Sequence, residues 1–431
     1  MYDCISAVAT ASGTGGVAVI RLSGGNALKI AESMFSPLKS EIQPGRMYAG
    51  NIEGDGFTDY GFFVYFKAPR SFTGEDVVEF HCHGGVQIAR GILKKTLSLG
   101  ARLAEKGEFT RRAFLNGKLS LSSAEGMIDM INAESLALVR AGSMMYSEKL
   151  ARKVKEIQDD LKDVLAMTAV EIDYPEEDSD GADLLAISRK LEDITGATQK
   201  LAASYSSGKK IKNGVTVALC GKPNAGKSSL LNKLLGYEKA IVSDIAGTTR
   251  DVVEGTLEID GIKFNLMDTA GIRDHAGEIE SVGIERARAA VKSADVVLFL
   301  TDGREEFDEE SCGKVITVFS KCDCCKPCSK YDICVSAKTG EGIEELKTLL
   351  AQNGGGEVAL DKAYIVEERH YSALNKALIS LSSAANGIKT LTLDLISVDL
   401  KDAWDALGEI TGETASEEII STVFEKFCVG K

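Results

Sequence analysis

A short apolar run at residues 215–219 is followed directly by a pattern that binds phosphate. Residues 221–228 read Gly-Lys-Pro-Asn-Ala-Gly-Lys-Ser and match the spacing G-x-x-x-x-G-K-S between an expected strand and an expected helix. The backbone N–H groups of such a loop surround phosphate oxygens at the N-terminus of the helix. The ammonium group of Lys227 adds positive charge at the outer phosphates, and the hydroxyl of Ser228 is a suitable ligand for Mg²⁺. The spacing therefore predicts a site for a nucleoside triphosphate.

Three further segments follow in the order that a guanine nucleotide site requires. They read Asp-Thr-Ala-Gly at 268–271, Ser-Lys-Cys-Asp at 320–323 and Ser-Ala-Lys at 336–338. They resemble the elements of translation-factor-type GTPases that sense Mg²⁺ and the γ-phosphate, read guanine, and support the base. The carboxylate of Asp323 can accept hydrogen bonds from N1–H and from the exocyclic amine of guanine, a pair of donors that adenine does not offer. We therefore expect binding and hydrolysis of GTP.

Two positions depart from the usual pattern of such a site. The guanine-reading motif normally begins with Asn, but this chain has Ser320, whose hydroxyl is shorter than an amide and supports the base less well. Ile272 follows the Asp-Thr-Ala-Gly motif, where Ras-type GTPases have a glutamine that orients water. Because an aliphatic side chain cannot orient water, we expect another group or an ion to assist hydrolysis.

The composition of the chain is that of a globular protein large enough for about three domains. Of the 431 residues, 44% are apolar and 26% are charged, and the net charge is −14. This charge argues against a broad, non-specific nucleic-acid-binding protein, and the basic clusters at 149–155 and 209–212 are expected to lie on solvated helix faces. No apolar run reaches the ~18 residues needed to span a bilayer, and the first residues do not resemble a signal peptide. We expect a cytoplasmic protein that does not bind membranes.

The cysteines and histidines leave two alternatives open. Four of the ten cysteines lie between Cys322 and Cys328, where they overlap the guanine-reading motif and could form a metal or redox site. Reduced thiols in a loop are the favoured interpretation, because the spacing is not that of a small secreted disulfide-bonded domain. His81 and His83 alternate along an expected strand and could share a ligand, but no third or fourth ligand follows them, so a structural role is favoured.

The elements that must position these residues fall into three patterns. Alternating apolar residues at 17–22 and 61–66, with glycine-rich turns between them, predict an N-terminal α+β region. Apolar residues recur at helical spacing from about residue 119 to 208, and again from about residue 364. Between these stretches lie short apolar runs at 215–219, 252–259, 262–267, 296–300, 315–319 and 333–335, most of them separated by helical patterns. We therefore predict a multidomain α/β protein in which a domain with a mostly parallel sheet is inserted into a helical one.

Several motifs together make the chain similar to the MnmE (TrmE) family. They are Ile-Ala-Gly-Thr-Thr-Arg-Asp at 245–251, Asn224 in the phosphate loop, and Phe-Cys-Val-Gly-Lys at 427–431. In the N-terminal part, the matching motifs are Ser-Phe-Thr-Gly-Glu-Asp at 71–76, His-Gly-Gly at 83–85, Gly-Glu-Phe-Thr at 107–110 and Arg-Ala-Phe-Leu-Asn at 112–116. The resemblance covers essentially the whole chain.

The resemblance implies a domain organisation. An N-terminal α+β domain at 1–116 would bind tetrahydrofolate and dimerise. A discontinuous helical domain would comprise 117–212 and 354–431, with Cys-Val-Gly-Lys at its end. A Ras-like P-loop G domain would occupy 213–353 and hydrolyse GTP.

The resemblance also implies a function and its partners. The protein would add a carboxymethylaminomethyl or aminomethyl group at C5 of the wobble uridine of certain tRNAs. It would act as a homodimer that forms a heterotetramer with the flavoprotein MnmG (GidA). Its cofactors would be GTP, Mg²⁺, K⁺, and 5-formyl- or 5,10-methylene-tetrahydrofolate as the one-carbon source.

Finally, the resemblance assigns residues to sites. The potassium ligands would be Asn224, Ser243, Ile245 and Thr248, the magnesium ligands Ser228 and Thr249, and the residue that positions the hydrolytic water Glu280. Folate would be bound by Arg21, Glu79, Lys118 and Lys431, with Cys428 as a candidate catalytic thiol. The complete GTP-binding set is Asn224, Ala225, Gly226, Lys227, Ser228, Ser229, Ser243, Asp244, Ile245, Ala246, Gly247, Thr248, Thr249, Asp268, Thr269, Ala270, Gly271, Ser320, Lys321, Asp323, Ser336, Ala337 and Lys338.

Two other functions are compatible with parts of the sequence. A ribosome-assembly GTPase would use the same nucleotide chemistry, but it would normally carry an RNA-binding module or a second G domain, and the sequence contains neither pattern. A cysteine-based metal or redox sensor would be built on the segment between Cys322 and Cys328. Metal analysis of protein purified without added metal would distinguish this sensor from a GTPase.

Overall fold

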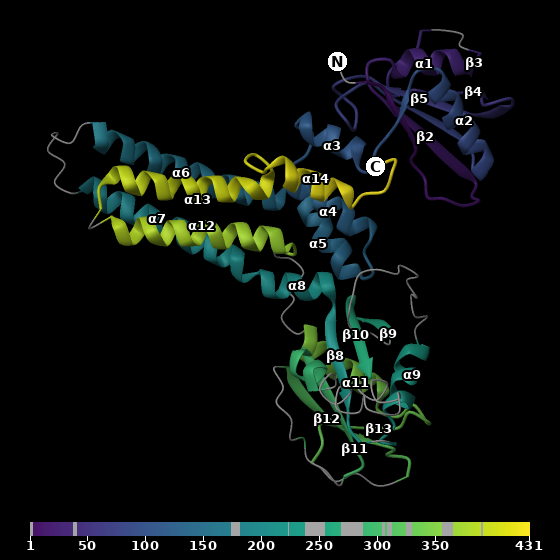
Figure 1. Ribbon diagram of the computed structural model, residues 1–431. Helices are drawn as coiled ribbons and strands as arrows, with labels where there is room; N and C mark the ends of the chain where they lie inside the picture. The colour runs from purple at the N-terminus through teal and green to yellow at the C-terminus, as the bar shows by residue number, and fades with distance from the viewer. Residues whose placement is uncertain are drawn as a thin grey trace, which may run out of the picture. The chain divides into compact units, whose positions relative to one another are not determined.

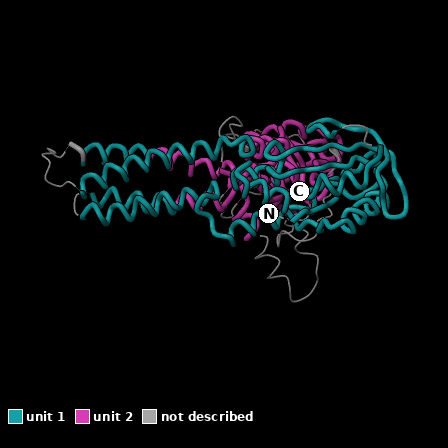
Figure 2. Tube along the Cα trace, turned by 90° about the horizontal axis from the view of Figure 1, so that it is seen from above, with its two compact units in different colours: residues 1–128, 144–195, 376–431 teal, residues 129–143, 196–375 magenta. Residues whose placement is uncertain are grey.

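The structure is a computed structural model that describes residues 3–37, 41–173, 182–222, 224–237, 255–268, 288–303, 307, 313–324, 330–355, 365–388 and 391–431. It divides into two compact units, which Figure 2 shows in different colours. The first comprises residues 1–128, 144–195 and 376–431, and the second comprises residues 129–143 and 196–375. Each unit is therefore assembled from segments that are distant in the sequence.

The N-terminal part of the first unit is built on a seven-stranded sheet in the order β3-β4-β5-β6-β2-β1-β7 (Figure 1). Its strands are β1 (Ile5–Val8), β2 (Val17–Ser23), β3 (Phe35–Ser36), β4 (Met47–Glu53), β5 (Thr58–Phe66), β6 (Val77–His83) and β7 (Arg102–Leu103). Alternate residues such as Ile20, Phe63 and Phe80 are fully buried and pack with helices α1 (Ala27–Met34) and α2 (Val86–Ser98). The predicted α+β region, with strands at 17–22 and 61–66, is confirmed.

The rest of the first unit is mainly helical. Apolar residues of α6 (Lys149–Asp173) at 150, 154, 157, 161 and 164 are buried, as expected for one face of a helix. Helix α13 (Leu393–Thr411) packs along this helix, and the two run side by side in Figure 1. The predicted helical stretches are thus confirmed. Helices α3 (Glu108–Leu115) and α14 (Glu417–Glu425) also belong to the first unit. The division between the units passes through α4 (Leu121–Ile131), α5 (Leu136–Tyr146), α7 (Ala182–Ala203) and α12 (Glu368–Gly387).

The second unit contains a six-stranded sheet in the order β13-β12-β11-β8-β10-β9. All neighbouring strands are parallel except β9 and β10, which confirms the prediction of a mostly parallel sheet. The strands are β8 (Val215–Cys220), β9 (Gly255–Ile259), β10 (Ile262–Asp268), β11 (Val296–Thr301), β12 (Lys314–Ser320) and β13 (Ile333–Val335). Every residue of β11 is buried, as is typical of a central parallel strand. Residues 252–254 of the expected strand at 252–259 lie outside the described residues.

Helix α8 (Tyr205–Asn213) leads into this sheet and corrects one expectation. Lys212 does not lie on a solvated face, because its ammonium group donates hydrogen bonds to the carboxylates of Asp129 and Glu367. The distance to Asp129 Oδ1 is 2.8 Å, and only 8% of the Asp129 side chain is exposed. The correction has a simple cause: Asp129 is 83 residues away in the sequence, so no local pattern indicates the partner.

The lengths and polarities of the helices indicate whether any of them could cross a membrane. Among the helices of the described ranges, none is both long enough and apolar enough to cross a bilayer.

Candidate functional site

The phosphate loop joins β8 to helix α9 (Lys227–Tyr237), as the motif requires. Gly221 has φ +135°, and a side chain at this position would collide with the carbonyl oxygen of Leu300 on β11. Asn224 and Gly226 also have positive φ, at +65° and +92°. These conformations turn the chain sharply between the strand and the helix, and they explain the glycines of the motif. The helix N-terminus faces the loop and can bind anions.

The two charged or hydroxyl side chains of the motif lie where the prediction requires them. The Lys227 ammonium group donates hydrogen bonds to the carbonyl oxygens of Gly221 and Lys222, at 2.8 and 2.9 Å, so it spans the loop. The Ser228 hydroxyl donates to Asp268 Oδ2 at 3.0 Å. A hydroxyl and a carboxylate at this separation form an oxygen donor set of the kind that Mg²⁺ prefers. The residues present therefore fit the predicted magnesium site.

The guanine-reading and base-supporting motifs meet at the ends of β12 and β13. The Ser336 hydroxyl donates a hydrogen bond to Asp323 Oδ1 at 2.8 Å. This bond favours the ionised carboxylate and lowers the pKa of Asp323 below its usual range. Ionised Asp323 has only acceptor oxygens, as recognition of two guanine donors requires.

A cavity of about 260 Å³ connects these motifs to the phosphate loop. Its lining includes Gly226 and Ser229 from one side, and Ser320, Asp323, Ser336, Ala337 and Lys338 from the other. Lys321 donates a hydrogen bond to the carbonyl oxygen of Asn224 at 2.7 Å, so it joins the two loops directly. The cavity is lined by the guanine-reading and base-supporting motifs and adjoins the phosphate loop, so a base in the cavity would place its phosphates at that loop.

Ser320 occupies the position at which Asn is usual. Its side chain is buried, and its hydroxyl donates to the carbonyl oxygen of Thr301 at 3.4 Å. The hydroxyl therefore joins the ends of β11 and β12, while Asp323 faces the cavity.

Some of the predicted nucleotide residues lie outside the described residues. They are Ser243, Asp244, Ile245, Ala246, Gly247, Thr248, Thr249, Thr269, Ala270, Gly271 and Glu280. The predictions for K⁺, for the second Mg²⁺ ligand and for the hydrolytic water therefore stay predictions.

Two of the predicted folate residues, Arg21 and Glu79, are neighbours on the N-terminal sheet. They are partners in the register of β2 and β6, and their side chains form an ion pair with Nε to Oε1 at 2.8 Å. The guanidinium carbon of Arg21 also lies 5.8 Å from the ring centre of Phe72 and 5.7 Å from that of Phe109. Phe72 and Phe109 were not singled out from the sequence, although both belong to the quoted motifs at 71–76 and 107–110. They keep the Arg21 side chain close to Glu79.

Lys118 contacts the loop that carries Phe72 at a different point. Its ammonium group donates to the carbonyl oxygen of Pro69 at 3.0 Å. The nearby Asn116 donates to the carbonyl oxygen of Thr73 at 2.7 Å. The loop at 69–76 thus connects Lys118 with Arg21.

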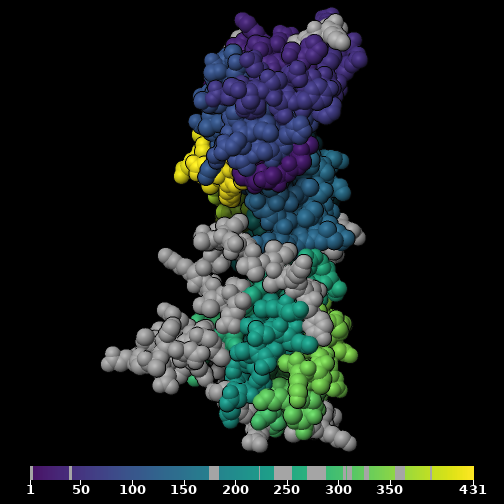
Figure 3. Space-filling model, turned by 90° about the vertical axis from the view of Figure 1, so that its right-hand side faces the viewer, coloured from purple at the N-terminus to yellow at the C-terminus, as the bar shows by residue number. Residues whose placement is uncertain are grey.

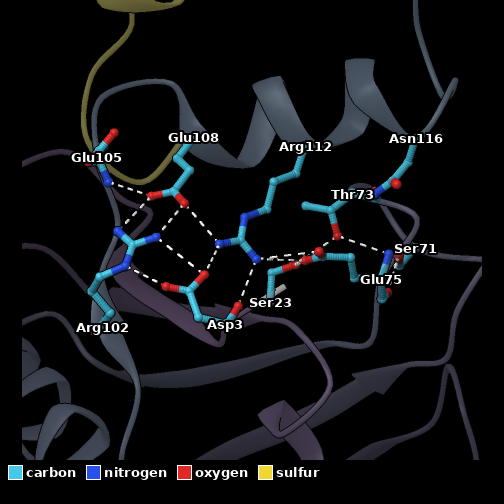
Figure 4. A network of polar contacts seen from close by, with 10 residues as sticks. All are labelled: Asp3, Ser23, Ser71, Thr73, Glu75, Arg102, Glu105, Glu108, Arg112 and Asn116. Atoms are coloured by element: carbon cyan, nitrogen blue, oxygen red, sulfur yellow. Dashed lines mark hydrogen bonds and ion pairs between the residues drawn. The ribbon is translucent and has the colours of Figure 1, made fainter. Parts of the chain in front are cut away.

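An ionic network holds this loop in place (Figure 4). Arg112 is only 4% exposed and contacts Glu75 of the loop, Glu108 of its own helix, and Asp3. Glu75 also accepts a hydrogen bond from Ser23 of β2 at 2.6 Å. The arginine and the glutamate both belong to quoted motifs, but their pairing depends on a contact between residues 37 apart, which spacing does not reveal.

The segment that carries Cys428 and Lys431 lies against the N-terminal sheet domain. The carbonyl oxygen of Cys428 accepts a hydrogen bond from the N–H of Gly107 at 3.4 Å. Gly430 has φ +97°, and a side chain here would collide with the carbonyl oxygen of Val8 on β1. Figure 3 shows this segment in yellow against the blue N-terminal residues. The C-terminal segment therefore contacts β1. This strand pairs with β2, and β2 carries Arg21.

The two histidines of β6 have separate acidic neighbours. His83 Nδ1 lies 2.7 Å from Asp59, and His81 Nε2 lies 3.3 Å from Glu79. Each ring is therefore paired with a different carboxylate.

The cysteine segment at 322–328 is described only in part, because Cys325 and Cys328 lie outside the described residues. Cys324 is exposed, and burial followed by the charge of Glu341 raises the pKa of Cys322. A raised pKa disfavours the thiolate that a reactive or metal-binding cysteine needs.

Comparison with known proteins agrees with this arrangement along the whole chain. Residues 4–118 match the family described as "GTP-binding protein TrmE N-terminus", and residues 121–428 match "MnmE helical domain". The tRNA modification GTPase MnmE of Natranaerobius thermophilus is 37% identical over 456 residues, which cover 100% of this chain and 99% of the relative. The MnmE of Clostridioides difficile is 37% identical over 455 residues, with the same coverage.

Among solved structures, the chain matches the G domain of the T. maritima FeoB iron transporter, with 29% identity, 32% of this chain covered, 98% of that chain covered and a TM-score of 0.25. This TM-score is too low to carry an argument. The sequence matches over the full length and the geometry of the nucleotide site together show that the chain is a GTPase and belongs to the MnmE family of tRNA modification GTPases.

Proposed function

We propose that this GTPase modifies C5 of the wobble uridine of tRNA, together with the flavoprotein MnmG, and uses a reduced folate as the one-carbon source. The observation that carries the proposal is the match to tRNA modification GTPases over the whole chain, including both the nucleotide site and the N-terminal domain. The domain boundaries predicted from the sequence, at 1–116, 117–212, 213–353 and 354–431, belong to this proposal.

The nucleotide half of the proposal is supported by the positions of Lys227, Ser228 and Asp323, while Thr249 comes from the family resemblance. Lys227 and the helix N-terminus would stabilise the negative charge of the β- and γ-phosphates, and Ser228 and Thr249 would ligate Mg²⁺. Bound Mg²⁺ would neutralise charge that develops on the transferred phosphoryl group. Asp323 would select guanine because its two carboxylate oxygens face two N–H donors.

Hydrolysis in this proposal requires a further cation and a residue that orients water. Asn224, Ser243, Ile245 and Thr248 would hold K⁺ near the phosphates, where an arginine acts in other GTPases. Glu280 would orient the attacking water, because Ile272 offers no polar group.

The folate half rests on the polar groups around the loop at 69–76. Glu79 accepts hydrogen bonds and suits the donor edge of a pterin, and the side chains of Arg21, Lys118 and Lys431 suit carboxylates. When bound, the folate would supply the one-carbon unit. Arg21 and Glu79 would orient it, and Cys428, whose carbonyl oxygen accepts a hydrogen bond from Gly107, would be the candidate thiol. A homodimer, in which the N-terminal domains pair, and a heterotetramer with MnmG complete the proposal.

Mass spectrometry of wobble nucleosides tests the proposal. A strain that lacks the gene should lose the C5 modification, the wild-type chain should restore it, and the Asp323→Asn and Arg21→Ala variants should restore little of it. Unchanged wobble uridines in the strain without the gene would reject the proposed function, whatever the GTPase activity.

A further inference from the structure

We propose that an open pocket beside Lys118 binds the chain of γ-linked glutamates that extends from a reduced folate. This inference rests on the proposed function, because it extends the predicted folate site. The pocket has a volume of about 650 Å³. It lies where the first two turns of α6, the end of α13 and residues 114–120 meet within the first unit.

The pocket presents positive charge that the protein itself does not neutralise. Lys118, Arg152 and Lys155 line it, together with Glu148 and Glu413. Within the described part of the chain, the guanidinium group of exposed Arg152 has neither a hydrogen bond nor an ion pair. Among the described residues, the Lys118 ammonium group has a single polar contact, with the neutral carbonyl oxygen of Pro69. Both groups are therefore available to carboxylates from outside the chain.

The two acidic side chains of the pocket are already engaged. Glu148 Oε1 accepts hydrogen bonds from the backbone N–H of Ser120 at 3.0 Å and from the hydroxyl of Ser123 at 2.7 Å. Glu413 pairs with Lys155 at 3.3 Å. These contacts hold the carboxylates against α4 and α6 and leave Lys118 and Arg152 without an acidic partner in the pocket lining.

The pocket shares Lys118 with the predicted folate residues. Phe72 of the loop at 69–76 contacts Arg21, which pairs with Glu79, while Pro69 of the same loop contacts Lys118 at the rim of the pocket. In the proposed arrangement the pterin lies at Glu79 and a carboxylate of the first glutamate pairs with Lys118. Each further glutamate adds one carboxylate, and Arg152 lines the same pocket as Lys118.

The size of the pocket favours this ligand over RNA. A volume of about 650 Å³ lies in the range for small-molecule sites and accommodates a short, flexible chain of carboxylates. A folded RNA would contact a broad basic surface instead, whereas this protein has a net charge of −14 and two carboxylates in the pocket lining.

The test compares 5-formyltetrahydrofolates that carry one or three glutamates, by calorimetric titration of the full-length protein. The wild type should bind the triglutamate about fivefold more tightly, as expected for the one exposed carboxylate–cation pair that Arg152 adds to the pair at Lys118. In Arg152→Gln, the ratio of the two dissociation constants should fall to about two or less. The matched control is Lys153→Gln, which removes a positive charge from the adjacent, exposed residue that does not line the pocket, and it should keep the wild-type ratio.

Three outcomes would overturn the inference. The ratio in the wild type could be one, Arg152→Gln and Lys153→Gln could lower it equally, or Arg152→Gln could weaken tRNA binding while the ratio persists. The last result would assign the pocket to RNA. Wild-type protein that binds neither folate would reject the folate part of the proposed function as well, whereas binding without a dependence on glutamate number rejects the pocket alone.

Discussion

The cluster of Asp129, Lys212 and Glu367 should lower the free energy of unfolding as the pH rises, because ionisation of Asp129 places a second buried negative charge beside Glu367. It contains two carboxylates and one ammonium group, and the Asp129 and Glu367 side chains are only 8% and 10% exposed. Burial, and then the charge of Glu367, raise the pKa of Asp129 to about 7, although Lys212 opposes them. The Oδ2 atom of Asp129 is buried without a hydrogen-bond partner among the described residues. We therefore expect Asp129 to be protonated in the folded protein at mildly acidic pH.

The sign of the effect follows from proton binding. In the unfolded chain Asp129 has an ordinary pKa near 3.8, so between about pH 4 and 7 the folded state binds the extra proton. The free energy of unfolding must then fall as the pH rises through this window. One pKa unit corresponds to about 1.4 kcal/mol, which gives an upper bound of about 4 kcal/mol over three units. About two of these three units lie between pH 5 and 7, so over that range we expect about 2 kcal/mol.

The variant Asp129→Asn removes this dependence, because the amide cannot ionise and leaves Lys212 paired with Glu367. The assay is thermal unfolding of the wild type and the variant at pH 5, 6, 7 and 8. Because several domains can unfold separately, the Tm of each transition is compared between the two proteins. The difference in Tm, variant minus wild type, should increase with pH by roughly 4–8 °C for about 2 kcal/mol. In Glu367→Gln the pKa of Asp129 should fall, and the pH dependence should weaken.

A constant difference in Tm between pH 5 and 8 would refute this reasoning. So would a variant that becomes progressively less stable than the wild type as the pH rises, because that result would mean that ionised Asp129 stabilises the fold through Lys212.

Three further predictions concern the nucleotide and folate sites. Asp323→Asn should shift the preference from GTP toward xanthosine triphosphate, because one acceptor becomes a donor; competition binding measures this, and equal affinity of the wild type for ATP and GTP would contradict it. Phosphate release should be at least tenfold faster in K⁺ than in Na⁺ and should slow in Glu280→Ala, and equal rates in the two salts would exclude a potassium site at Asn224. Gly430→Ala should weaken folate binding by tenfold or more while GTP hydrolysis continues, because its φ of +97° and the carbonyl of Val8 leave no room for a methyl group; an unchanged folate affinity would argue against a role for this segment.

Local patterns were sufficient for much of the architecture. Alternation at 17–22 and continuous apolar runs such as 296–300 predicted strands because burial on one or both faces repeats along the strand itself. The phosphate loop was predictable because glycine positions with positive φ leave a direct mark in the sequence. The contacts of Lys212 with Asp129 and of Arg21 with Phe72 were not predictable in this way, because they join chain segments that only folding brings together.

The contact between Lys212 and Glu367 also has a consequence for protein engineering. Lys212 lies at the end of α8, one residue before the chain departs into the segment at 213–366, and Glu367 is the first residue after it. The two ends of that segment therefore meet, so a replacement segment would have to bridge only a short gap between α8 and α12.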